Sequence, residues 1–216
     1  MALGALGPFL LPLAFLSCVG AIPPHDEVAR MARYVVNSCD WASMATISTH
    51  KPVVGRAFSN VFSISDGPPQ RGSGVPYLYL TPLEISVQDI KINPEVSLAM
   101  TLAQTDYCRK NGFDAQSPLC CRVILCGTIV TVNKTEIGIA KKALFERHPA
   151  MASWPPDHGW YFAKLNITNI WVLDYFGGLK TVTPEEYYNA KPEYERNLTG
   201  KKWMEIMNVV NQNKVR

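Results

Sequence analysis

The sequence predicts an α+β protein in which an antiparallel β-barrel forms the core and helices flank it. Five or six segments alternate apolar and polar side chains, as half-buried strands do. Several of these segments are joined by connections of hairpin length, and only a few stretches have helical spacing. A parallel sheet would require strict alternation of strands and helices, which this chain of 216 residues lacks.

The first elements are a helix and a hairpin. Residues 26–37 are predicted to be helical, because their apolar side chains recur at helical spacing and acidic residues stand at the start. Residues 41–49 and 58–65 alternate as strands do, although imperfectly. The connection 50–55 contains a proline and a glycine and is short enough to join them as a hairpin.

A long loop separates this hairpin from the rest of the chain. Its prolines lack backbone donors and its glycines weaken any regular ladder, so residues 66–76 are predicted to be irregular. A strand over 77–81, a short helix over 84–93 and a strand over 95–104 follow. The last of these has the cleanest alternation in the chain.

The remaining pattern is a strand over 122–132, a helix over 134–146 and a strand over 160–176. In the last strand, Lys164, Asn166 and Thr168 are expected to point outward, because side chains alternate between the two faces of a strand. Beyond this point the apolar register shifts, which predicts a bulge or bend near the middle of the strand.

The barrel domain is expected over residues 21–190. The residues before and after it do not continue its pattern of strands and helices. Residues 1–20 resemble a secretory signal peptide, with an apolar run shorter than the roughly 20 residues of a membrane span. No stable membrane insertion is therefore expected. Residues 191–216 form a C-terminal extension whose apolar residues have helical spacing, and an amphipathic docking helix competes there with a frayed tail.

The usual signatures of catalysis and nucleic-acid binding are missing, so no catalytic, cofactor-binding or metal-ligating residue is assigned. The net charge of +3 comes without a basic run interleaved with aromatic residues. The glycine-flanked Ser73 lacks the spacing of a nucleophile elbow, and the four histidines lack metal-binding spacing. No phosphate-binding glycine pattern occurs, and Asp174 is interpreted as a turn or hydrogen-bonding residue.

Cysteine usage suggests a disulfide. Removal of the signal peptide would leave an odd number of cysteines, so at least one would be free or paired with another chain. Cys108 and Cys120 flank a segment with turn signals and are the candidate disulfide, whereas the partners of Cys39, Cys121 and Cys126 stay open. A zinc site is disfavoured because paired ligand spacings are lacking.

Three sequons follow the predicted signal peptide, and none has proline at its middle position. Their acceptor residues are Asn133, Asn166 and Asn197. Together they predict an N-glycosylated protein of the secretory pathway.

Aromatic residues gather between residues 154 and 176. One interpretation is that they pack in the core or in a subunit interface. The other is that they line a ligand-binding slot, for example for a sugar. The group consists of Trp154, Trp160, Tyr161, Phe162, Trp171, Tyr175 and Phe176.

Several motifs together resemble the CREG family of secreted "cellular repressor" glycoproteins, and most closely its broadly expressed member. The motifs are Ser65-Asp-Gly-Pro-Pro69, Gly72-Ser-Gly-Val-Pro-Tyr77, Met100-Thr-Leu-Ala-Gln-Thr105, Gln116-Ser-Pro-Leu-Cys120, the stretch from Phe162 to Gly178, and Val182-Thr-Pro-Glu-Glu-Tyr-Tyr188. The resemblance covers residues 26–189, and the extension that follows is not explained by it.

The resemblance implies a split β-barrel like that of flavin mononucleotide (FMN)-dependent pyridoxamine phosphate oxidases, assembled as a homodimer. It implies glycans at Asn133 and Asn166, secretion, and a place in the endolysosomal system. It further implies binding to the cation-independent mannose 6-phosphate receptor through glycans, and a role in growth restraint and differentiation. No catalytic residues come with it.

The alternative function is an FMN-binding oxidoreductase of the same fold. In the related oxidases, the part corresponding to residues 77–89 helps to hold the flavin phosphate. Here residues 82–89 supply two acids and no Lys or Arg, so charge-assisted donors for a phosphate are missing. The loop 66–76 is also long enough to occupy a cleft near the expected dimer interface. No cofactor is therefore expected.

Overall fold

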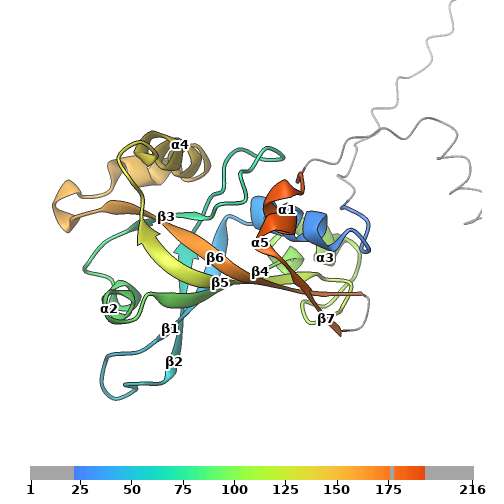
Figure 1. Ribbon diagram of the computed structural model, residues 1–216, viewed down its shortest axis with the longest axis horizontal. Helices are drawn as coiled ribbons and strands as arrows, with labels where there is room; N and C mark the ends of the chain where they lie inside the picture. The colour runs from blue at the N-terminus through green and yellow to red at the C-terminus, as the bar shows by residue number, and fades with distance from the viewer. Residues whose placement is uncertain (1–21, 176–177, 193–216) are drawn as a thin grey trace, which may run out of the picture.

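The computed structural model describes residues 22–175 and 178–192. Seven antiparallel strands form one sheet in the order β2-β1-β4-β5-β6-β3, and β7 pairs with β6 (Figure 1). The strands are β1 (Trp41–Ile47), β2 (Ala57–Ser63), β3 (Tyr77–Leu80), β4 (Glu95–Thr101), β5 (Arg122–Thr131), β6 (Tyr161–Asp174) and β7 (Gly178–Val182). The helices are α1 (Val28–Ser38), α2 (Ile85–Ile92), α3 (Asp106–Lys110), α4 (Ile137–Arg147) and α5 (Pro184–Asn189).

The sheet curls, so that one face of its strands becomes the inside of a half-barrel. Alternate residues on each central strand are buried there, among them Met44, Leu98 and Leu125. Helix α1 adds Met31 and Val35 to the same core. The alternation in the sequence therefore follows from one face of the sheet meeting apolar side chains and the other meeting solvent.

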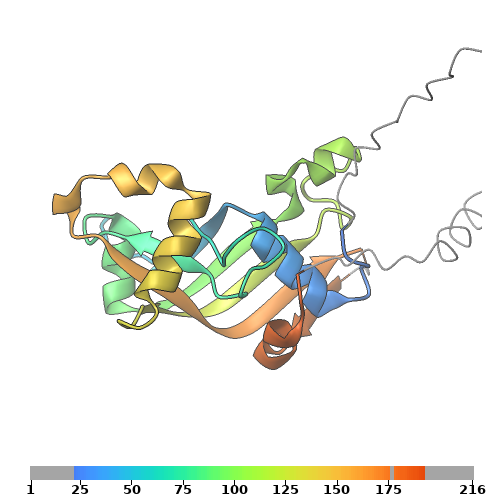
Figure 2. The same cartoon turned by 90° about the horizontal axis from the view of Figure 1, so that it is seen from above.

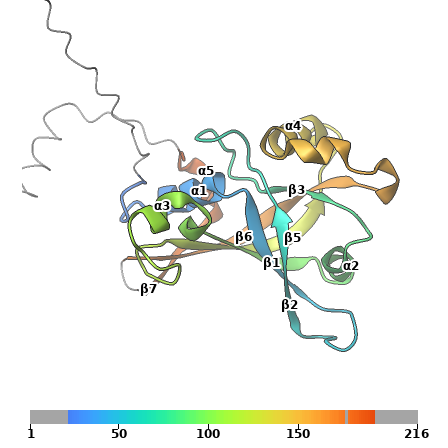
Figure 3. The same cartoon turned by 180° about the vertical axis from the view of Figure 1, so that it is seen from behind.

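The helices pack against the curled sheet in two groups. Helices α1 and α5 lie side by side near β6 and β7, while α4 stands over β3 and β6 (Figures 1 and 2). The view from behind shows the β1–β2 hairpin extending away from these helices, with α2 beside it (Figure 3). No helix within residues 22–175 and 178–192 is long and apolar enough to cross a membrane.

Most of the predicted elements occur, with three differences. The segment 109–119, read as a loop, includes the end of α3, which Thr105 caps by accepting from the backbone N of Tyr107. Strand β7 and helix α5 had no strand or helix prediction of their own. Four of the five β7 residues are exposed, so the strand lacks the alternation on which sequence reasoning depends.

The proline-rich loop 66–76 is held against α1 and α5. Its Asp66 carboxylate is buried and accepts hydrogen bonds from Asn37 Nδ2 (2.7 Å) and from the backbone N of Gly74 (3.1 Å). The Tyr187 hydroxyl of α5 donates to the carbonyl of Gly74. The loop also forms one wall of a cavity of about 390 Å³, whose other walls are α1 and α4. Its position relative to a dimer interface stays a prediction.

We expect Asp66 to make the free energy of unfolding larger in mild acid than at neutral pH. Burial raises the pKa of Asp66 above its usual 3.8, although Asn37 and the backbone N of Gly74 oppose the shift. The folded state therefore binds this proton more tightly than the unfolded state, and the associated stability is lost as pH rises through the raised pKa. As pH rises from about 4, near the usual pKa, to 7, urea unfolding should show a smaller fall in stability for Asp66→Asn than for the wild type. Equal pH slopes would contradict the assignment.

Candidate functional site

The sequon in β6 occupies an irregularity of the sheet. The pairing of β5 with β6 shifts between Cys126, opposite Asn169, and Gly127, opposite Ile167, so no β5 residue stands opposite Thr168. This is the predicted bulge. Asn166 and Thr168 are exposed and Leu165 and Ile167 are buried, which agrees with the predicted orientation, while Lys164 is half-buried.

Gly127 allows this bulge to form. A Cβ atom at position 127 would lie 2.0 Å from the carbonyl oxygen of Asn166, a distance that real Cβ atoms essentially never show. Only glycine lets the two backbones approach this closely. The backbone at the sequon asparagine Asn166 is therefore set by a residue on the neighbouring strand.

Asn133 lies in the turn between β5 and α4. Its Oδ1 accepts from Thr135 Oγ1 (2.7 Å) and from the backbone N of Glu136 (3.0 Å). Both bonds use Oδ1, whereas a glycan is carried by Nδ2, and the side chain is exposed. The local geometry thus leaves the acceptor nitrogen accessible. Asn197 lies outside the described residues.

Aromatic rings cluster at the edge strand β3, but not in the grouping that the sequence suggested. Tyr79 is the centre: its ring stacks on Trp160 (centroids 5.0 Å apart), Phe162 (4.8 Å) and Trp154 (6.0 Å). Tyr175 instead contacts His25. Trp171 lies in the half of β6 that pairs with β7, and Phe176 lies outside the described residues. The predicted aromatic group did not include Tyr79, which lies far from it in the sequence. The alternation of Tyr77 and Tyr79 along one strand was the available signal that both rings share a face.

A cavity of about 190 Å³ opens beside this aromatic cluster, between β2 and β3. Its described lining residues are Val61, Phe62, Ser63, Tyr79, Leu80, Thr81, Glu84, Met151, Trp154 and Trp160. Glu84 is the single carboxylate among them, and the set contains no Lys or Arg. The cavity adjoins the strand–turn–helix segment that the resemblance relates to a flavin phosphate site.

The two acids of this segment, Glu84 and Asp89, accept hydrogen bonds that stabilise the fold. Glu84 caps α2, accepting from the backbone N of Val87 (3.0 Å) and from Asn60 Nδ2 (2.6 Å). Asp89 is fully buried and accepts from Thr46 Oγ1 and from the backbone N and Oγ1 of Thr49. Burial alone would raise the pKa of Asp89, but the bonds from Thr49 and Thr46 outweigh it and lower the pKa. A phosphate dianion would meet carboxylates here rather than cations, so these residues do not fit it.

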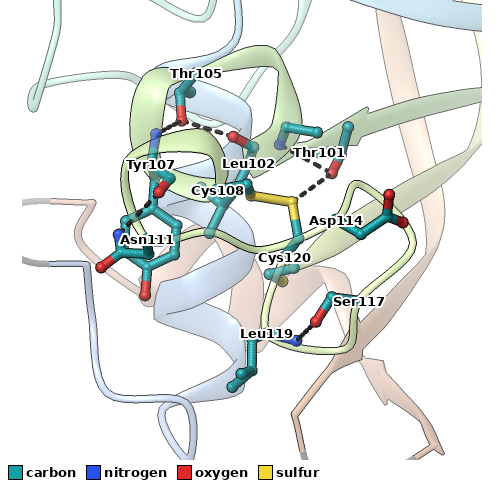
Figure 4. Close-up of a disulfide and its surroundings, with 12 residues drawn as sticks. Thr101, Leu102, Thr105, Tyr107, Cys108, Asn111, Asp114, Ser117, Leu119 and Cys120 are labelled. Atoms are coloured by element: carbon teal, nitrogen blue, oxygen red, sulfur yellow. Dashed lines mark hydrogen bonds between the residues drawn. A yellow bond between two sulfur atoms is a disulfide. The ribbon is translucent and has the colours of Figure 1, made fainter.

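The candidate disulfide between Cys108 and Cys120 is present, with Cα atoms 5.6 Å apart (Figure 4). It ties α3 to the end of the following turn, and Cys120 Sγ lies 3.8 Å from Thr101 Oγ1. The other described cysteines are free thiols. Burial raises the pKa of Cys39 to about 12 and also raises that of Cys121, so both stay protonated and unreactive.

Removal of this disulfide should destabilise the protein by about 3 kcal/mol, because it releases a short loop in the unfolded chain. We expect the double variant Cys108→Ala, Cys120→Ala to show this loss in urea unfolding. Cys126→Ala is the matched control, since this thiol is unpaired and half-buried. Equal losses in the two variants would contradict a role of the disulfide in stability.

Asp174 has structural partners. Asp174 accepts from the backbone N of Tyr175 and bonds His25 Nδ1 at 2.7 Å, which agrees with a hydrogen-bonding residue at a strand end. In the part of the chain that the structure describes, no group of three His, Cys, Asp or Glu side chains could hold a metal ion.

Solved structures share the fold. A heme-binding protein from Mycobacterium smegmatis superposes with a TM-score of 0.61 at 17% identity, covering 76% of this chain and 60% of that one. A protein of unknown function from Agrobacterium tumefaciens, Atu2129, gives 0.55 at 19% identity, covering 77% and 62%. At this identity the likeness concerns the fold alone, and it confirms the predicted split β-barrel with flanking helices.

Sequence relatives identify the family. The chicken protein named CREG1 is 63% identical over 175 residues, covering 80% of this chain and 91% of its own length. Human CREG1 is 61% identical over 169 residues (78% and 77%), whereas mouse CREG2 is 38% identical over 172 residues (80% and 60%). The likeness to CREG1 thus exceeds that to CREG2. Because the family model "CREG, beta-barrel" also matches residues 23–189, the chain belongs to the CREG family.

Proposed function

We propose that this protein is a secreted and endolysosomal N-glycosylated homodimer without enzymatic activity, which controls cell growth and differentiation by binding a receptor of the mannose 6-phosphate type. One observation carries the proposal: two sequon asparagines, Asn133 and Asn166, are exposed on a barrel whose flavin-related segment offers a phosphate no cation. The membership of the CREG family supports the same function.

Glycosylation is tested first. We expect the full chain, expressed in secretory cells, to lose mass on digestion with an N-glycosidase. Asn133→Gln and Asn166→Gln should each remove one glycan's worth of mass, and Asn197→Gln reports on the third sequon. Asn111→Gln, an exposed asparagine outside any sequon, is the control. A secreted protein whose mass does not change on digestion would overturn the glycoprotein proposal.

Receptor binding is tested separately. Immobilised cation-independent mannose 6-phosphate receptor should capture the secreted protein, and free mannose 6-phosphate should release it. Capture should disappear after N-glycosidase treatment, because the glycans carry the recognised group. Binding that survives both treatments would favour recognition through the protein surface instead.

A second copy of the chain should bind the outer face of the sheet. This face has a hollow of about 310 Å³ whose lining combines apolar side chains such as Trp41, Ile124 and Leu173 with polar ones such as Gln104 and Arg122. Trp41 is 41% exposed, and burial of such side chains against an equivalent face would favour association. Light scattering should give twice the chain mass for the wild type and a monomer for Ile124→Lys. A wild-type monomer would overturn the dimer.

The absence of flavin chemistry is tested by colour and binding. The purified protein should be colourless, and added FMN should keep its fluorescence. A yellow protein, or saturable quenching of FMN, would replace the proposal with a flavin-dependent function.

A further inference from the structure

The loop that the disulfide closes carries a pair of basic residues on its surface. The chain leaves the bridge at Cys108 and returns to it at Cys120 (Figure 4). Arg109 and Lys110 follow the first cysteine at the end of α3, and their side chains are 81% and 57% exposed. Residues 111–112 are exposed as well. Four consecutive residues of one turn are therefore accessible from solvent.

The backbone around this pair is held by local hydrogen bonds. The backbone N of Gly112 donates to the carbonyl of Arg109 (3.2 Å), and the backbone N and side chain of Asn111 both donate to that of Tyr107 (3.2 and 2.8 Å). In the described part of the chain, no backbone bond joins residues 109–114 to the sheet. A segment held by bonds within one turn can open while the sheet stays intact.

The two basic side chains form exposed ion pairs. Asp106 pairs with Arg109, and its carboxylate lies 3.0 Å from Lys110 Nζ. The Asp106 side chain is itself 53% exposed, and exposed pairs of this kind contribute little to stability because water and salt screen them. An acidic pocket on another protein can therefore replace Asp106 as the partner of both cations.

The described chain has a second pair of adjacent basic residues, Lys141 and Lys142, but it lies within the 11-residue helix α4. The residues around it are buried against the sheet, namely Ala140, Ala143 and Leu144. Drawing this pair out of its helix would expose part of the core, which the pair in α3 does not require. Exposed loop tips are the preferred sites of proteolytic cleavage, and the pair in α3 meets that condition.

We propose that the bond between Lys110 and Asn111 is a processing site for an endoprotease that cuts after paired basic residues. Water adds across this bond, completing a carboxyl group on Lys110 and an amine on Asn111. The product has two chains, which the Cys108–Cys120 disulfide keeps joined and the pairing of β4 with β5 keeps folded. The inference rests on the proposed function, because the protease would meet the chain on the secretory and endolysosomal route.

The experiment takes the full chain from the medium and the lysosomes of secretory cells and compares gels run with and without reductant. We expect one band without reductant and two fragments after reduction, one of which begins at Asn111 by N-terminal sequencing. In the variant Cys108→Ala, Cys120→Ala the fragments should separate without reductant. A secreted, glycosylated chain that stays whole after reduction, or that is cut elsewhere, would overturn the inference and leave the proposed function standing. A chain that is neither secreted nor glycosylated would overturn both.

Variants test the recognition of the basic pair. The double variant Arg109→Gln, Lys110→Gln should reduce the cleaved fraction at least about tenfold, because an acidic pocket discriminates strongly against a neutral side chain. Lys141→Gln, Lys142→Gln is the matched control and should leave the cleaved fraction unchanged. Asp106→Asn releases both cations, so trypsin should cut the native protein here up to about fivefold faster, the change that about 1 kcal/mol produces. Equal loss of cleavage in the two double variants would contradict the site.

Discussion

Gly127→Ala should reduce the free energy of unfolding by at least about 3 kcal/mol, a loss at the high end for single substitutions. The added Cβ would lie 2.0 Å from the Asn166 carbonyl oxygen and 2.9 Å from its carbonyl carbon. Both contacts are with backbone, so no side-chain rotation relieves them. The longest pairing in the sheet, between β5 and β6, would have to shift.

Gly138→Ala is the matched control. Gly138 lies in α4 and a Cβ there would meet nothing within 4 Å. Alanine favours a helix by about 1 kcal/mol over glycine, so this variant should be slightly more stable than the wild type. Urea unfolding followed by tryptophan fluorescence measures both. If Gly127→Ala unfolds at the wild-type urea concentration, the bulge does not require glycine.

Arg33→Met is the second large effect, with an expected loss of about 3–5 kcal/mol. The Arg33 guanidinium is buried and donates to four backbone carbonyls, which belong to Gly72 in the loop and to Tyr187, Tyr188 and Ala190 at the end of α5. Methionine fills similar space but leaves these oxygens without that donor. Thermal unfolding should show the loss, together with easier proteolysis of the loop 66–76.

Two comparisons isolate the cause. Arg33→Lys keeps the charge but cannot reproduce the planar fork of a guanidinium, so it should recover only a small part of the stability. Arg109→Met in α3 removes an exposed pair with Asp106 and should cost less than about 1 kcal/mol. Similar losses for positions 109 and 33 would show that the buried carbonyl contacts of Arg33 add nothing to stability.

Sequence reasoning predicted the barrel because its signal is local. Residues such as Val96, Leu98 and Met100 alternate along one strand, and the structure buries all three. The bulge was predicted for the same reason, since a shift in apolar register is visible within β6 alone. The family resemblance then supplied the split-barrel class.

The partners of buried polar residues could not be predicted in this way. Arg33 joins segments about 40 and 155 residues away, and nothing in its neighbourhood in sequence indicates them. The cavity beside Tyr79 likewise requires β2 and β3 to meet across the curl of the sheet, together with Met151 and Trp154 from the connection after α4. Such sites depend on tertiary contacts between distant segments, which periodicity does not encode.

The pairing of β6 with β5 and β3 bears on when the glycan proposed at Asn166 could be attached. Asn166 lies opposite Thr128 in β5, and its neighbour Lys164 is paired with β3 as well. An enzyme that attaches a glycan must draw the acceptor segment into its own active site, which a strand held by its ladder does not permit. Under the proposed function, the sugar at Asn166 would therefore have to be added before β5 and β6 pair with each other. A secreted molecule without that sugar would then record a chain that folded faster than it was modified.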